Sequence, residues 1–389
     1  MTRYGLSLLL LLLSSCVLAE VAVEGRIKFQ HIENNELSDT NLSTNFARLL
    51  LKADLPLSNN SLFYLETIAA YDSSFAQGKY SFEHNEFDLH QGYLSVTSPN
   101  HAIKLGRQVW SVADQRLLGK REGTNVRRRF DGVMYQNNVL NQLQINAYHG
   151  YAVASKTGVF DDKYLSSERI TGVYFSTAEL LLHSMWYRDT TAENNESRHT
   201  IEAQYRKKLG RFSSTFHVAH QTGIVKSEHT KAWFAQFSGL YSFANLKFGP
   251  TLSYATGGEA GHEDGYFRSL YAKAPYYSEA GIFSTTNIKH IGAKLQAQLT
   301  DKFDISLDMR RLFRVNEQGD IFGPGRSLFI ANEQLKGAKI ADTYSLTTQY
   351  LYTKKISFEL ITSYINMSNR ANLVKDQSFF VEAMLHFAY

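Results

Sequence analysis

Apolar and polar residues alternate with a period of two over about eighteen segments of roughly ten residues each, through almost the whole chain. Segment 46–55 shows the form, because one face carries Ala47, Leu49, Leu51, Ala53 and Leu55. The other face carries Arg48, Lys52 and Asp54, with Leu50 as an apolar residue between them. Segments 289–299 and 303–314 repeat the arrangement. A period of two is that of a β-strand with two different faces, so the pattern predicts an all-β protein.

The connections between these segments distinguish a soluble sandwich from a membrane barrel. The short ones fall at 58–60, 98–100, 210–211, 244–245, 300–302 and 354–355. Between them lie long stretches at 72–85, 110–128, 152–166, 255–285 and 314–340. Strict alternation of short and long connections predicts an antiparallel up-and-down transmembrane β-barrel of about 18 strands, with short periplasmic turns and long extracellular loops. Its apolar face would contact lipid and its polar face would line the lumen, whereas a sandwich has Greek-key crossings and no such rule.

The composition agrees with a membrane barrel. Aromatic residues make up 13% of the chain, with 23 Tyr and 25 Phe, as expected for a sheet with aromatic girdles. Beyond the N-terminus no stretch approaches about eighteen continuous apolar residues, which excludes a helical membrane protein. Cys16 is the only cysteine, so the exported chain must fold without disulfides. A net charge of +4 is too weak to indicate nucleic acid as a partner.

The two ends of the chain predict its location. Arg3 precedes the apolar run 6–13, and small residues up to Ala19 follow, which predicts a signal peptide over 1–19 and a single barrel domain over 20–389. Leu13-Ser14-Ser15-Cys16 also fits a lipoprotein box, in which Cys16 would be acylated. Segment 379–389 is apolar on one face and ends on an aromatic residue, which resembles the signal read by the barrel assembly machinery of the bacterial outer membrane. We therefore expect a monomeric barrel in that membrane, in contact with its lipid and lipopolysaccharide.

The stretch 103–135 is rich in arginine and carries the most specific motifs. These are LGRQ at 105–108, DQRL at 114–117 and RRFDGV at 128–133, preceded by the strand DLHQGYLSV at 88–96. The pattern resembles the core signature of the alginate export family, whose type member is an eighteen-stranded outer-membrane porin for the anionic polysaccharide alginate. The resemblance implies lumen or mouth residues that shape a constriction, namely Arg107, Gln108, Asp114, Arg116, Arg129 and Asp131.

Arginine suits such a site because a uronate polymer carries one carboxylate per sugar, which a guanidinium binds through two parallel hydrogen bonds. Arg107 and Arg129 are expected on adjacent strands near the outer rim, with Arg116, Arg127 and Arg128 in the loop between them. Crowded guanidinium groups in a narrow throat favour anions over cations. An alternative, which does not exclude the first, is a structural network that pins the outer loop to the barrel wall, formed by Arg107, Asp114, Arg116, Arg129 and Asp131.

The sequence also departs from the family's pattern. The resemblance implies a long eighth periplasmic loop that acts as a plug, but the corresponding turn spans only about 353–355. Any occlusion should therefore come from the large outer loops folding inward, above all 255–285. The predicted lumen is mixed in charge rather than plainly positive. Its basic residues are Arg26, Lys28, Arg48, Lys52, Arg206, Lys208, Lys294, Arg310 and Arg314, and its acidic residues are Glu24, Asp54, Glu66, Glu86, Asp88, Glu202, Asp304, Asp308 and Glu382.

These observations predict a porin for hydrophilic, anionic saccharides such as alginate or its oligomers, in either direction of transport. A porin for organic acids or neutral oligosaccharides is the alternative, and a barrel without a transport role is a third possibility. No enzyme, cofactor or metal is expected. His217 and His220 point to opposite faces of one strand, the acidic turn 261–265 offers too few oxygens for Ca²⁺, and the histidines show no catalytic partner pattern.

Overall fold

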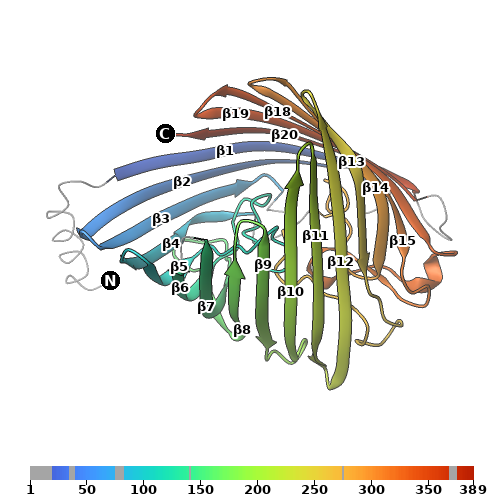
Figure 1. The fold of residues 1–389 in the computed structure, drawn as a ribbon, viewed down its shortest axis with the longest axis horizontal. Coiled ribbons are helices and arrows are strands. Elements are labelled where there is room, and N and C mark those ends of the chain that lie inside the picture. The colour runs from blue at the N-terminus through green and yellow to red at the C-terminus, as the bar shows by residue number, and fades with distance from the viewer. Residues whose placement is uncertain (1–19, 35–39, 75–82, 140–141, 274–275, 368–374) are drawn as a thin grey trace.

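The computed structural model describes residues 20–34, 40–74, 83–139, 142–273, 276–367 and 375–389. Eighteen strands form one antiparallel sheet, in which each strand pairs with the next along the chain and β15 passes directly to β18. β1 pairs with both β2 and β20, so the sheet closes into a barrel (Figure 1). The predicted fold class is confirmed. The predicted signal peptide and Cys16 lie outside the described residues.

The barrel strands range in length from 8 residues in β5 to 17 residues in β2. They are β1 (Glu20–Glu33), β2 (Leu42–Ser58), β3 (Ser61–Asp72), β4 (Asn85–Thr97), β5 (His101–Gln108), β6 (Phe130–Val139), β7 (Leu143–Ala154), β8 (Lys163–Ser176), β9 (Leu180–Asp189), β10 (Glu196–Leu209), β11 (Phe212–Val225), β12 (Glu228–Phe243), β13 (Leu246–Ala255), β14 (Ile288–Thr300), β15 (Phe303–Arg314), β18 (Lys339–Thr353), β19 (Ile356–Asn366) and β20 (Gln377–Ala388). A small hairpin of β16 (Ile321–Phe322) and β17 (Leu328–Ile330) lies in the connection between β15 and β18.

The two faces of the sheet have opposite character, as the alternation predicts. On β5, Ile103 and Leu105 point outward and are 46% and 60% exposed, as expected of side chains that contact lipid. Arg48 points inward on β2 and is buried. Leu50, the apolar exception on the inward face of β2, packs with Ile68 and with Val126 of an outer loop. This exception therefore serves as an anchor for a loop inside the barrel.

The short connections that the sequence predicts lie at one rim, and most connections at the other rim are longer. The expected strict alternation is wrong at one place, because only Lys226 and Ser227 join β11 and β12 at the outer rim. The pairing of these strands continues up to Val225 and Glu228, and both turn residues have positive φ values, 48° and 76°. Two such residues match the twist of a tight hairpin, so no longer loop is needed there.

The ends of the described chain meet at the inner rim. The amide of Val23 donates to the carbonyl oxygen of Tyr389 at 2.7 Å, and the amide of Tyr389 donates back at 2.8 Å. β20 thus carries the apolar face that the sequence predicts and also closes the barrel. Among the described residues, no helix has the length and apolar character needed to cross a membrane.

Two long outer loops, 109–129 and 256–287, fold into the barrel instead of away from it (Figure 1). They join inside, where Leu118 and Tyr271 form a parallel bridge. The main hydrophobic core lies between these loops and the inward side chains of the wall, and it includes Trp110, Leu118 and Phe130. The expected inward folding of 255–285 is confirmed, and loop 109–129 shares the interior with it.

Candidate constriction of the pore

Loop 109–129 is held against β1 by cations that point into the barrel. Arg26 Nη1 donates to the carbonyl oxygen of Glu122 at 2.6 Å, and Arg26 Nη2 donates to that of Thr124 at 2.7 Å. Lys28 Nζ donates to the carbonyl oxygen of Gly123 at 2.9 Å. Charge-assisted hydrogen bonds of this kind are stronger than neutral ones. The tip of the loop is therefore fastened to the wall through its backbone.

A cluster of ionic side chains reinforces this attachment. Arg48 Nη2 contacts Glu24 Oε1 at 3.0 Å and Glu122 Oε1 at 2.8 Å. Arg127 contacts the same two carboxylates, at 2.7 Å for Glu24 and 2.6 Å for Glu122, and Lys52 contacts Glu24 at 2.5 Å. Burial alone would raise the pKa of Glu122, but the hydrogen bonds and charges of Arg127 and Arg48 hold it well below its usual range. Opposite charges thus clamp the loop to β1 and β2.

Asn125 attaches the same loop to β3 and to the segment that precedes β4. Its amide donates to Glu83 Oε2 at 2.8 Å, and its Nδ2 donates to the carbonyl oxygen of Tyr71 at 2.9 Å. Burial raises the pKa of Glu83, although the charge of Lys28 and the Asn125 amide act in the opposite direction. The attachment therefore relies on one deeply buried carboxyl group.

Aromatic packing holds the other side of the loop. The ring of Trp110 stacks on that of Phe130 at 4.8 Å, and Phe130 meets Tyr271 edge to face at 5.2 Å. The amide of Gly119 donates to the carbonyl oxygen of Tyr271 at 2.8 Å, and the Tyr271 hydroxyl donates to Glu168 of β8 at 2.6 Å. Both inward loops are thereby tied to each other and to the wall.

A chain of polar groups runs from the loop to the inner wall of β9–β11. Asp114 Oδ2 lies 3.3 Å from His217 Nδ1, and His217 Nε2 lies 2.7 Å from Glu202 Oε2. The other oxygen of Glu202 lies 2.6 Å from His183 Nδ1. Burial would raise the pKa of Asp114, but its hydrogen bond with His217 and the charges of His217 and Arg116 lower it. As predicted, His220 is on the opposite face, where it packs on Trp233.

Arg116 and Arg128 are the arginines of the loop that lie on aromatic rings. The Arg116 guanidinium is 3.5 Å from the centre of the Tyr276 ring, and its side chain is 20% exposed. Its Nε donates to Asp114 at 3.2 Å. Arg128 lies 4.8 Å above the ring of Tyr271, and its Nη1 has no hydrogen-bond partner among the described residues. Burial and the nearby charge of Arg121 lower the pKa of Arg128 to about 9.

Arg107 and Asp131 lie elsewhere. They are directly opposite each other on β5 and β6, on the face that carries Ile103 and Leu105, and so point away from the lumen. Arg107 Nε and Nη2 donate to the two oxygens of Asp131 at 2.8 and 3.0 Å. The pair links two strands below the point where loop 109–129 enters the barrel.

Gln108 and Arg129 are structural supports of that entry point. Gln108 Nε2 donates to the carbonyl oxygen of Gly132 at 3.2 Å, and its Oε1 accepts from Trp110 Nε1 at 3.4 Å. Arg129 forms a fully buried ion pair with Asp162 of the β7–β8 connection at 2.5 Å. Of the seven residues that the sequence singles out, Asp114, Arg116 and Arg127 therefore lie on the inserted part of loop 109–129, and Arg129 ends the loop at the wall.

Sequence reasoning missed the wall residues that receive the loop. Alternation predicts that Arg26 and Arg48 face the lumen, but it identifies no partner for them. They are directly opposite each other on β1 and β2, and like charges in such positions are destabilising unless other groups compensate them. Once the register is known, the two facing arginines indicate that another segment supplies oxygens that compensate their positive charges. The tyrosines of loop 256–287 gave no comparable signal, since aromatic residues are frequent throughout the chain.

One acidic cluster has the spacing of a metal site; two of its carboxylates already have donors, whereas Asp161 Oδ1 is buried without a partner among the described residues. Single oxygens of Asp88, Asp161 and Asp162 lie within 4.8 Å of one another. Asp88 Oδ2 accepts from the amides of Asp161 and Asp162, both at 2.9 Å, and Asp162 Oδ2 accepts from Arg129. The cluster thus joins the β7–β8 connection to β4 through its own hydrogen bonds.

Comparison with known proteins agrees with this architecture. The family model for alginate export matches residues 19–366. No curated protein sequence matches the chain. Among solved structures, OccAB3 of Acinetobacter baumannii superposes with a TM-score of 0.70 at 7% identity over 95% of this chain and 99% of that one. OpdK of Pseudomonas aeruginosa with vanillate gives 0.69 at 8% identity over 95% and 98%.

A third outer-membrane barrel, OccAB1 of Acinetobacter baumannii, gives a TM-score of 0.67 at 12% identity over 95% of this chain and 96% of that one. Identities this low show a shared fold alone. The fold and the family together make the protein a porin-like barrel of the bacterial outer membrane. Since the family model spans nearly the whole sequence, the chain belongs to the alginate export family.

Proposed function

We propose that the protein passes anionic saccharides, such as alginate or its oligomers, through the space beside loop 109–129. The observation that carries the proposal is the position of Arg116, which lies on the ring of Tyr276 inside the barrel with part of its side chain exposed. The buried ring of Tyr276 fixes the orientation of the Arg116 guanidinium, whose exposed part can bind a sugar carboxylate. Membership of the alginate export family supports the same substrate class.

Arg128 adds a second cation to the interior of the barrel. Arg127 is neutralised by Glu24 and Glu122, whereas Arg128 rests on Tyr271 and retains an unpartnered Nη1 among the described residues. Fixed charges of one sign in a narrow throat raise the local concentration of the opposite ion. We therefore assign anion preference to Arg116 and Arg128 together.

Passage of small aromatic or aliphatic carboxylates is the second candidate. It is favoured by the two inward loops, which fill much of the barrel, and by the likeness of the fold to OpdK, whose structure contains vanillate. A carboxylate of that size would use the same arginines. We further infer that the protein acts as a single barrel without catalytic activity, and that the outward apolar face of β20 is read during its assembly into the membrane.

The test is the reversal potential of the purified channel in a KCl gradient. One charge at about 4 Å in water is worth about 1 kcal/mol, or roughly a fivefold change in local ion concentration. We expect Arg116→Gln with Arg128→Gln to reduce the preference for chloride by a factor of this order. Arg107→Gln is the matched control, since Arg107 points outward and is paired with Asp131.

An unchanged reversal potential in the double variant would contradict the assignment. Liposome uptake then separates the two substrate classes. If the first proposal holds, saturated uronate oligomers should block the uptake of chloride and should themselves enter. If only vanillate-sized carboxylates enter and the oligomers neither enter nor block, the second candidate is correct.

A further inference from the structure

Two arginines face each other on the outside of the barrel. Arg169 of β8 and Arg188 of β9 are direct partners in the antiparallel register. Their neighbours Ile170 and Tyr187, which are also partners, point inward and are buried, so the arginines point outward, where both are exposed. Like charges directly opposite each other in a sheet are destabilising. Such a pair is stable where an anion from outside the chain lies between the two side chains.

The chain itself does not supply that anion. Neither Arg169 nor Arg188 forms an ion pair within the part of the chain that the structure describes. Arg311, an outward arginine on β15 near the same rim, shows the contrasting arrangement. Its Nε contacts Asp342 of β18 at 2.7 Å, and Lys339 contacts the same carboxylate at 2.8 Å. The outward face of β8 and β9 carries no such carboxylate, because Glu168 and Asp189 share the inward face with Ile170 and Tyr187.

The depth of the pair in the membrane follows from its neighbour Trp186. This tryptophan lies two residues before Arg188 on the same outward face, is 47% exposed and stacks on His199 at 4.5 Å. Tryptophan on the lipid-facing side of a barrel marks the level of the lipid headgroups. Arg188 is closer than Trp186 to the outer rim, so both arginines lie where phosphate groups of the outer leaflet would be.

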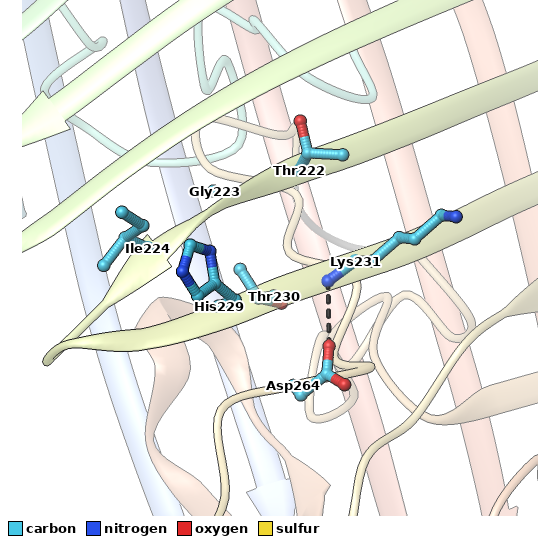
Figure 2. Close-up of a pocket in the computed structure, with 7 residues that line it drawn as sticks. All are labelled: Thr222, Gly223, Ile224, His229, Thr230, Lys231 and Asp264. Atoms are coloured by element: carbon cyan, nitrogen blue, oxygen red, sulfur yellow. Dashed lines mark hydrogen bonds between the residues drawn. The ribbon is translucent and has the colours of Figure 1, made fainter.

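A second basic point lies further round the same rim. His229 and Lys231 of β12 line a surface pocket of about 490 Å³. Thr222 and Ile224 of β11 line the same pocket (Figure 2). In the register, Arg188 is followed by Ser197, Ile224 and His229, which is three strand spacings or about 14 Å. Asp264 Oδ1 at this pocket accepts hydrogen bonds from the amides of Lys231 and Gly265, at 2.9 and 2.8 Å.

We propose that the outward face of β8–β12 at the outer rim binds a phosphorylated glycolipid of the outer leaflet, with one phosphate between Arg169 and Arg188. Two guanidinium forks can each donate two hydrogen bonds to one phosphate, which removes their mutual repulsion. His229 and Lys231 are at a distance that suits a second anionic group of the same headgroup. The site is separate from the lumen and does not depend on which solute the pore carries.

The experiment measures thermal unfolding of the full chain in a non-ionic detergent, with diphosphorylated lipid A as the probe. We expect lipid A to raise the unfolding temperature of the unaltered protein. In Arg169→Gln with Arg188→Gln, its affinity should fall by about tenfold or more for each lost guanidinium. Without lipid, the double variant should be at least as stable as the unaltered protein, because the repulsion between the arginines is gone.

Controls make each outcome decisive. Arg311→Gln should keep the full effect of lipid A, and Arg169→Lys with Arg188→Lys should keep part of it, since the charge remains but the fork is lost. An undiminished lipid effect in the double Gln variant would overturn the proposal. An equal effect of dephosphorylated lipid A would exclude recognition of phosphate, and an equal effect of inorganic phosphate would exclude the glycolipid.

Discussion

Arg129 and Asp162 form an ion pair in which both side chains are 0% exposed, at a separation of 2.5 Å. The pair lies where loop 109–129 returns to the wall, and the second partner comes from the β7–β8 connection. Asp162→Ala would leave the guanidinium buried without a counter-charge. Loss of one partner of a buried pair typically costs about 3–5 kcal/mol. We expect a large fall in the free energy of unfolding, measured with urea in lipid vesicles.

Lys207 and Glu179 provide the control for this prediction. Their contact at 2.7 Å is similar in length, but their side chains are 35% and 45% exposed. Water already solvates such charges, so Lys207→Ala should leave the urea midpoint nearly unchanged. Equal midpoints for Asp162→Ala and Lys207→Ala would show that the buried pair is not an essential support.

Residue roles were predictable from sequence only where they depend on the nearest strands. Alternation correctly placed Arg48 inward, because strand period alone decides the face. It could not show that Leu50 receives Val126, since that contact depends on a loop from far along the chain. The environment of Arg107 depends in the same way on β4, β6 and the β7–β8 connection.

At the scale of the element, the position of loop 109–129 against the wall depends on the ion pairs of Glu122. Arg127 and Arg48 hold the pKa of Glu122 below its usual range against the opposing effect of burial. The ionised carboxylate therefore contributes stability above the ordinary pKa of about 4.5, and this contribution is lost only as the pH falls through the lowered value. We expect single-channel conductance to stay constant from pH 7 to pH 5.

Glu122→Gln removes the charge at every pH. We expect this variant to show frequent larger openings at pH 7, because Arg48 and Arg127 lose one of the two carboxylates that they share. Glu259→Gln, in the exposed part of loop 256–287, serves as the control and should behave as the unaltered protein. Identical traces for all three proteins would exclude the clamp on β1 and β2 as the element that holds the loop.

Deletion of 258–282 tests the second inward loop. This deletion removes Tyr271, whose carbonyl oxygen accepts from Gly119 and whose ring packs on Phe130. We expect the bilayer conductance to rise, both because space is vacated and because loop 109–129 loses a neighbour. Shortening the outer connection 190–195 is the control. If conductance does not rise after the deletion, loop 256–287 is not a plug.

The sequence predicted which outer segments are long but not how they fold. The length of a loop follows from the spacing of the strands in the sequence. The polar residues of a loop fit a position on the surface as well as one inside the barrel. The inward course depends on contacts such as Leu118 with Tyr271, which join segments far apart in the chain. The short turn at Lys226 and Ser227 was missed because neither residue is the glycine or asparagine that usually marks such a turn.

At the scale of the whole molecule, the barrel is a sheet with its apolar face outward. The architecture was predictable because every strand repeats the same period, so an error at a single residue does not change the predicted fold. Closure requires only that β1 and β20 pair, and their register runs from Glu24 with Ala388 to Glu33 with Phe379. Pore selectivity has no such redundancy, since it depends on a few side chains in two loops.

Leu295 and Gln296, adjacent on β14, test the inverted arrangement of the whole barrel. Leu295 points outward near the middle of the strand and is 39% exposed, while Gln296 points into the lumen. Arginine on the lipid face at the bilayer midplane costs about 2–4 kcal/mol, whereas water solvates it in a lumen. Leu295→Arg should therefore lower the free energy of unfolding in lipid vesicles by about this amount, and Gln296→Arg should change it little. If the exposed face that carries Leu295 contacted water instead of lipid, an arginine at this position would be tolerated. Equal stability of the two variants in vesicles would thus contradict a lipid-facing position for Leu295.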